Sequence, residues 1–383
     1  MKKLKKSGLI ALLLSFIMLL QSSQLEAAML CAEEINSQIE TEDATNLVFD
    51  SENVLLVLND PSLHEFPLHN AQKLLEDKIR ELQRENRLRL EEEKRLAKEA
   101  AVKKKEEELQ QFEVIIRSTE KELYDSSILH LEEMGYEPIK VLGAYEPSGV
   151  PGVIYAEGNV PILISAHLDT VHWNLPGVNE DIYDEVNGIF SSYNGIGGDD
   201  RCGVFAARLI IERLAEYGIR PYVMFCEKEE WGCTGTYNAL PYIERPDLKF
   251  LIGLDRRGGD LACFYGCTNP EFRDYILNEW GYEQSFYGLT DIVPMGQRWD
   301  IASVNLSVGY YLLHTLSEYI VVEELYQNVD KIVEIIKADV NQNMYFDYYG
   351  YNNEIRLPEM ATVDESIDTI TPYQRTRTED IIA

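Results

Sequence analysis

Short apolar runs alternate with amphipathic helical segments between residues 118 and 345, and this alternation constrains the fold more than any other feature. Helical periodicity marks residues 126–134, 201–217, 270–280 and 318–340. Between them lie apolar runs typical of buried strands, at residues 139–142, 153–155, 162–165, 222–226, 250–254, 261–265 and 304–310. Strands that alternate with helices predict a sheet sandwiched between helical layers.

Residues 71–117 form a different kind of segment, without glycine or proline and rich in Glu, Lys, Arg and Leu. Many oppositely charged side chains lie four residues apart, a spacing that stabilises a solvated helix. An apolar heptad seam begins at Leu75, but two later seam positions fall on Asn86 and Arg89. We therefore expect a charged helical spacer, with self-association through a coiled coil in residues 71–113 as the alternative.

The two ends of the chain differ from its centre. Residues 1–28 have the organisation of a secretory signal peptide, with lysines, an apolar run from Gly8 to Leu20, and small residues at 27–28. That run is shorter than the ~20 apolar residues of a membrane-spanning helix. We expect an exported protein, secreted or periplasmic, without stable membrane insertion once the signal is removed; a retained anchor is the alternative. Residues 29–70 form an acidic N-terminal segment, and residues 346–383 a polar C-terminal extension.

Charge and cysteine content exclude some classes of protein. The chain has 35 basic and 66 acidic side chains, a net charge of −31. Binding to nucleic acid needs a basic face, so we expect no nucleic-acid partner. The six cysteines are too few and too irregularly placed for a disulfide scaffold, although a Cys263–Cys267 or a Cys226–Cys233 bridge stays open for an exported protein.

Potential metal ligands follow several of the predicted strands, at the ends where open α/β folds place their sites. His167 lies at a strand tip, and Asp169 points to the same side and can accept the second imidazole N–H. Alone, such a pair is more often structural than catalytic. Asp199 and Asp200 follow a glycine-rich stretch and begin a helix, where capping and the helix dipole would also explain them.

Four further residues complete the pattern. Glu229 and Glu230 are adjacent carboxylates at a strand end, which repel each other unless a cation or a proton intervenes; a solvated acidic turn is the alternative. Asp255 could simply pair with Arg256, and His314 could be a core histidine. Taken in order, however, the strand and loop ends present His, Asp, Glu-Glu, Asp and His, a complete ligand set for two divalent ions.

The segments SAHLDTV, GGDDRCGV, EKEEWG, LDRRG and HTLSEY resemble, in this order, the metal-site motifs of the co-catalytic zinc exopeptidases, the clan of the M20 and M28 peptidases. The resemblance covers roughly residues 120–343. It implies a three-layer α/β/α sandwich with a mixed central sheet, and two divalent metal ions, with zinc as the expected metal. In the implied site, His167 and Asp255 hold one ion, Glu230 and His314 hold the other, Asp199 bridges them, Asp169 orients His167, and Glu229 is the general base.

The resemblance leaves the branch of the clan open. The stretch between Asp255 and His314 is too short for the lid or dimerisation domain that M20 enzymes insert there. Thr290-Asp291 looks like a segment near the M28 substrate pocket, whereas the step from His167 to Asp199 and the HTLSEY segment are closer to M20. We expect a single, lidless catalytic domain at residues 118–345.

The implied activity is hydrolysis of amide bonds in small peptides by an aminopeptidase or a di/tripeptidase, through a hydroxide shared by two zinc ions and a glutamate base. Two alternatives remain: a carboxypeptidase or N-acyl-amino-acid deacylase of the same clan, and a non-catalytic binding domain on a helical stalk. Asp200, Glu227 and Asp291 would favour a protonated α-amine beside the metals. Arg256 or Arg257 could instead bind a carboxylate.

Overall fold

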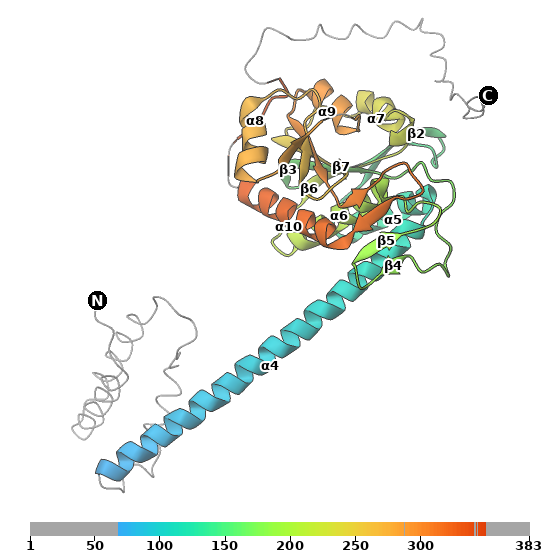
Figure 1. The fold of residues 1–383 in the computed structure, drawn as a ribbon. Coiled ribbons are helices and arrows are strands. Elements are labelled where there is room, and N and C mark those ends of the chain that lie inside the picture. Colours follow the sequence, from blue (N-terminus) through green and yellow to red (C-terminus); the bar gives the residue numbers. More distant parts are fainter. Residues whose placement is uncertain (1–67, 287, 341, 343, 350–383) are drawn as a thin grey trace, which may run out of the picture. The chain divides into compact units, whose positions relative to one another are not determined.

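The computed structural model describes residues 68–286, 288–340, 342 and 344–349 (Figure 1). The predicted signal peptide, residues 29–67 of the acidic segment and residues 350–383 of the extension lie outside the described residues, so export stays a prediction. In the described ranges, no helix is long and apolar enough to cross a membrane. The described residues divide into two units, one that ends at Glu107 and one that begins at Glu108.

Helix α4 runs from Leu68 to Arg117 without a break, as the lack of glycine and proline predicts. Its side chains from residue 84 to residue 107 are exposed, and pairs such as Arg95–Glu99 (2.6 Å) join charges four residues apart. The large exposed apolar side chains of this stretch recur two and six residues apart rather than three and four, at Leu88, Leu90, Leu96 and Val102. The predicted coiled coil is therefore not borne out by the described part of the helix.

The last residues of α4 belong to the second unit. That unit begins at Glu108, not at residue 118 as the sequence suggested. Phe112 stacks on Phe205 with ring centroids 4.5 Å apart and meets Phe190 edge-on at 5.1 Å. The helix packs against the core here, whereas residues 84–107 are exposed, because the charged sequence is followed by three buried apolar side chains, Phe112, Ile115 and Ile116.

The second unit also extends beyond residue 345. Phe346 and Tyr348 are buried, the latter completely. The Phe346 N–H donates to the Lys249 carbonyl (3.1 Å), and the Phe346 carbonyl accepts the Ala302 N–H (2.8 Å). The predicted start of a polar extension at residue 346 is thus wrong for residues 346–349, because two aromatic side chains return to the core.

An eight-stranded mixed sheet forms the centre of the second unit, in the order β1-β2-β6-β3-β7-β10-β8-β9. Strands β3, β6, β7 and β10 are parallel to one another, β2 and β8 run against their central neighbours, and β1 and β9 complete the edges. The carboxyl ends of the four central strands therefore share one edge of the sheet. The strands are β1 (Ile139–Gly143), β2 (Val150–Ala156), β3 (Val160–His167), β6 (Pro221–Cys226), β7 (Phe250–Arg256), β8 (Leu261–Cys263), β9 (Glu283–Ser285) and β10 (Ser303–Ser307).

Helices cover both faces of this sheet, which confirms the three-layer α/β/α class (Figure 1). Within β3, Ile162 and Ile164 pack into one hydrophobic cluster and Leu163 into the other, as the alternation of a strand requires. On the first face lie α5 (Glu120–Glu133), α6 (Gly198–Ala215), α8 (Pro270–Asp274) and α10 (Val322–Asp339). On the second lie α7 (Thr234–Ala239) and α9 (Ile292–Trp299).

A small antiparallel sheet, not anticipated from the sequence, lies in the order β11-β12-β5-β4. Its strands are β4 (Tyr183–Asp184), β5 (Ile189–Ser191), β11 (Tyr310–Tyr311) and β12 (Tyr319–Val321). The predicted strand at residues 304–310 is therefore divided between β10 and β11. The predicted helix 318–340 begins only at Val322, because residues 319–321 pair with β5 and β11.

All five cysteines in the described part of the chain are buried, and none of them is in a disulfide. Neither of the two candidate disulfides is formed.

Candidate active site

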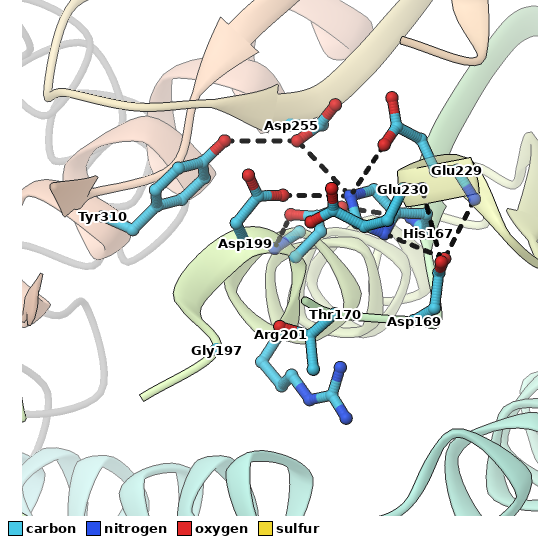
Figure 2. Close-up of polar contacts among 12 residues, drawn as sticks. His167, Asp169, Thr170, Gly197, Asp199, Arg201, Glu229, Glu230, Asp255 and Tyr310 are labelled. Atoms are coloured by element: carbon cyan, nitrogen blue, oxygen red, sulfur yellow. Dashed lines mark hydrogen bonds and ion pairs between the residues drawn. The ribbon is translucent and has the colours of Figure 1, made fainter. Parts of the chain in front are cut away.

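Five of the predicted site residues converge at the carboxyl edge of the central sheet (Figure 2). His167 is the last residue of β3, and Asp255 is the penultimate residue of β7. Glu229 and Glu230 begin a 3-10 turn shortly after β6, and Asp199 lies in the first turn of α6 with non-helical backbone angles. Parallel strands end at the same edge, so residues far apart in the sequence come within contact distance.

Asp199 lies between two imidazole rings. Its Oδ1 is 3.0 Å from His167 Nε2, and its Oδ2 is 3.2 Å from Nε2 of His314, in the loop between β11 and β12. Each histidine has a second carboxylate, with Asp255 Oδ1 3.6 Å from His167 Nε2 and Glu230 Oε1 3.1 Å from His314 Nε2. Two three-residue donor sets, His167–Asp199–Asp255 and Asp199–Glu230–His314, therefore share Asp199.

The chemistry of these donor sets fits two divalent cations. Imidazole nitrogens and carboxylate oxygens are the ligands that zinc takes in catalytic sites. Burial and then the charge of Asp199 raise the pKa of Asp255 to about 6. Hydrogen bonds to Asp199 and then to Glu230 raise the pKa of His314 to about 10. The carboxylates thus favour positive charge between them, which is the condition that a bound cation meets.

Asp169 fixes the turn that carries the two glutamates. Its Oδ1 accepts the N–H of Glu229 (3.0 Å), its Oδ2 accepts that of Glu230 (3.3 Å), and Oδ1 lies 3.3 Å from His167 Nδ1. This arrangement suits the orienting role implied for Asp169. Glu229 Oε2 lies 3.9 Å from His167 Nε2, and burial above all raises the pKa of Glu229 well above its ordinary range.

Two acids expected beside the metals face the backbone instead. Asp200 Oδ2 accepts the N–H of His167 (3.1 Å), and Glu227 Oε2 accepts the N–H of Gly152 (2.8 Å). Both side chains are completely buried. The prediction that they would surround a substrate amine is wrong, because buried backbone N–H groups need acceptors and these carboxylates supply them.

The other charged candidates have different surroundings. Asp291 is buried and accepts the Thr236 hydroxyl at 2.5 Å, and burial raises its pKa to about 7. The Arg256 guanidinium donates to the Ser285 hydroxyl, which ties it to the end of β9. Arg257 is exposed.

Sequence reasoning missed two side chains that hold the donor residues. The Tyr310 hydroxyl donates to Asp255 Oδ1 (3.2 Å), and no local signal marks it (Figure 2). Glu318 is completely buried and accepts the N–H of Asp199 (3.1 Å). Its position four residues after His314 was the available signal, but the sequence suggested the start of a helix there.

Comparison with known proteins gives similarity of structure only. No family model matches the sequence, and no curated protein matches it. The chain is similar to the crystal structure of aminopeptidase PepT from Bacillus cereus, with 16% identity over 61% of this chain and 98% of that chain and a TM-score of 0.45. It is also similar to a tripeptidase from Staphylococcus aureus, with 15% identity over 61% and 98% of the two chains and a TM-score of 0.48. A TET aminopeptidase from a Thaumarchaeota archaeon gives 14% identity over 61% and 97%, with a TM-score of 0.43.

Proposed function

We propose that this protein is a metal-dependent exopeptidase that hydrolyses the amide bonds of small peptides, as an aminopeptidase or a di/tripeptidase. The observation that carries the proposal is the shared carboxylate of Asp199, which has one histidine and one further carboxylate on each side. His167 and Asp255 would hold one divalent ion, and Glu230 and His314 the other. When bound, such ions supply a water that ionises near neutral pH and polarise the scissile carbonyl.

Glu229 is the proton carrier of the proposed reaction. It belongs to neither of the two sets that share Asp199, although it forms a third group of possible ligands with His167 and Glu230, and it lies within 4 Å of His167 Nε2. Its Oε2 accepts a proton from the attacking water and returns it to the nitrogen of the leaving amine. The raised pKa supports this role, because burial makes Glu229 a stronger base than an exposed glutamate. Asp169 keeps the Glu229 backbone in place through the 3.0 Å hydrogen bond.

The preference for a free amino end rests on the charges around the donor sets. The Asp291 carboxylate lies close enough to raise the pKa of Glu229 and is itself affected by Asp169 and Asp255. Acidic surroundings stabilise a protonated α-amine and disfavour a substrate carboxylate. Arg256, a candidate to bind a carboxylate, already donates to the Ser285 hydroxyl.

The first test separates metal binding from proton transfer. Metal-free protein titrated with zinc should bind two ions per chain, and Glu229→Gln should keep both ions while kcat falls at least about a hundredfold. Glu230→Gln is the matched control, because Glu230 belongs to the Asp199–Glu230–His314 set that would hold one ion, and its loss should weaken zinc binding as well. Near-wild-type turnover of Glu229→Gln with unchanged zinc would contradict the role of the base. A wild-type chain that binds no zinc would favour the non-catalytic binding domain.

A peptide panel tests which end is recognised. We expect rapid hydrolysis of peptides with a free amino terminus, little after N-acetylation, and a small effect of C-terminal amidation. Faster hydrolysis of N-blocked peptides that keep a free carboxylate would instead support the carboxypeptidase or deacylase alternative. The exposed guanidinium of Arg257 would then be the first candidate for the carboxylate-binding group.

A further inference from the structure

Glu318 carries a buried carboxylate and contacts both the segment before Asp199 and the loop that carries His314. It is 0% exposed. Its Oε2 accepts the N–H of Gly197 at 2.8 Å and lies 2.9 Å from His172 Nε2, and its Oε1 accepts the N–H of Asp199 at 3.1 Å. Both oxygens therefore have defined partners, and two of these partners belong to the short segment that ends in Asp199.

The glycines before Asp199 let the backbone of this segment lie close to neighbouring side chains. A Cβ on Gly195 would lie 2.2 Å from the His172 ring, and Gly195 has a φ of +84°. A Cβ on Gly198 would lie 2.7 Å from Tyr310 Cβ and 3.0 Å from Ile320 Cγ1. The backbone before Asp199 therefore leaves no room for larger side chains at these two positions, and it lies beside His172 and Glu318, which are themselves in contact.

Glu318 also ends the loop that carries His314. The Glu318 N–H donates to the Thr315 carbonyl (3.2 Å), and β12 begins at the next residue. A single side chain therefore connects the loop of His314 to the segment of Asp199. His314 Nε2 and Asp199 Oδ2 face each other at 3.2 Å.

We propose that Glu318, oriented by His172, is a positioning residue that sets the separation of Asp199 and His314 and thereby the affinity of the Asp199–Glu230–His314 set for a divalent cation. This inference rests on the proposed function. A glutamine at position 318 has one acceptor oxygen and would turn its amide N–H₂ group toward one of the backbone N–H donors. That donor would lose its partner in a buried place, and the segment before Asp199 would shift to relieve it.

The effect should fall mainly on one of the two donor sets. His167 and Asp255 lie on the central strands β3 and β7, which are paired directly with each other. His314 lies in a loop, and its side chain is 47% exposed. A disturbance at Glu318 therefore moves the His314 set more than the His167 set.

The test is a competition titration of the metal-free full-length protein with zinc against a chromophoric chelator. We expect two binding steps in the wild type. In Glu318→Gln the Kd of one step should rise at least about tenfold, as for other residues that orient metal ligands, while the other step changes less. Cobalt absorption provides a second readout, in which Glu318→Gln loses the contribution of one ion. His172→Gln should weaken the same step less, because Glu318 keeps its two backbone donors.

Asp339→Asn is the matched control. Asp339, at the end of α10, is also a completely buried carboxylate of this unit. It pairs with Lys249 at 2.8 Å and belongs to neither of the two donor sets. The Asp339→Asn substitution should destabilise the fold and leave the Kd of both zinc-binding steps unchanged. If Glu318→Gln behaves like this control, Glu318 is merely structural, and the inference is overturned while the proposed function stands. If Glu318→Gln does not fold, an unchanged titration of His172→Gln overturns the inference. A wild type that binds no zinc overturns the proposed function and this inference together.

Discussion

Replacing Phe112 by alanine should destabilise the second unit by about 4 kcal/mol, although the residue lies in a helix whose sequence suggests a spacer. Its ring is completely buried, and truncating such a side chain to alanine costs about 3–5 kcal/mol. The ring also stacks on Phe205 at 4.5 Å and meets Phe190 edge-on at 5.1 Å. Aromatic pairs of this kind contribute about 0.5–1.5 kcal/mol beyond the area that they bury, which favours the upper half of the range.

Equilibrium unfolding of the full-length chain in urea measures this effect. All four tryptophans of the sequence lie in the second unit, and Trp299 is buried there, so fluorescence reports this unit. Val114→Ala is the matched control, because Val114 lies two residues further along the same helix with 65% of its surface exposed. The free energy of unfolding of this control should stay within about 0.5 kcal/mol of the wild type.

The reasoning would be refuted if Phe112→Ala changed the free energy of unfolding by less than about 1 kcal/mol, as a surface substitution does. Such a result would mean that the end of α4 does not pack into the core. The folded unit would then start near residue 118, where the change in sequence pattern places it.

Three further predictions concern metal binding, pH and a buried ion pair. Asp199→Ala should abolish tight zinc binding at both donor sets, measured by metal content after dialysis, because this carboxylate is common to both. Burial and then the charge of a nearby arginine lower the pKa of His130 to about 4, so the unfolded state binds more protons than the folded state between pH 4 and about 6.5. Stability should therefore fall as the pH is lowered from 7 to 5, by about 2 kcal/mol from this histidine alone; an unchanged pH slope in His130→Gln would contradict this. Lys249→Met leaves the Asp339 carboxylate buried without its cation and should cost about 3–5 kcal/mol in urea unfolding, whereas the more exposed Lys337→Met should cost less than about 1 kcal/mol.

The sequence predicted the three-layer class and a set of candidate residues, because both depend on local patterns, but it did not predict the small sheet of β4, β5, β11 and β12. Alternation across a strand predicts that Ile162 and Leu163 face opposite helical layers, and they do. His167 and Asp255 could be selected because each lies at or near the end of an apolar run, and parallel strands bring such ends together.

Tertiary structure alone decided what each buried polar group contacts. Asp199 and Asp200 are neighbours of the same chemical type, yet one faces two imidazoles and the other accepts a backbone N–H. The role of Glu318 could not be predicted from its sequence neighbours. Its carboxylate oxygens contact His172, Gly197 and Asp199, which lie more than a hundred residues earlier in the chain. Phe112 likewise lies near the end of a charged helix, and its ring is buried by Phe190 of β5 and Phe205 of α6, which are distant in the sequence. Periodicity is a property of the local backbone, whereas the partner of a buried carboxylate or ring is set by which distant segments the fold brings against it.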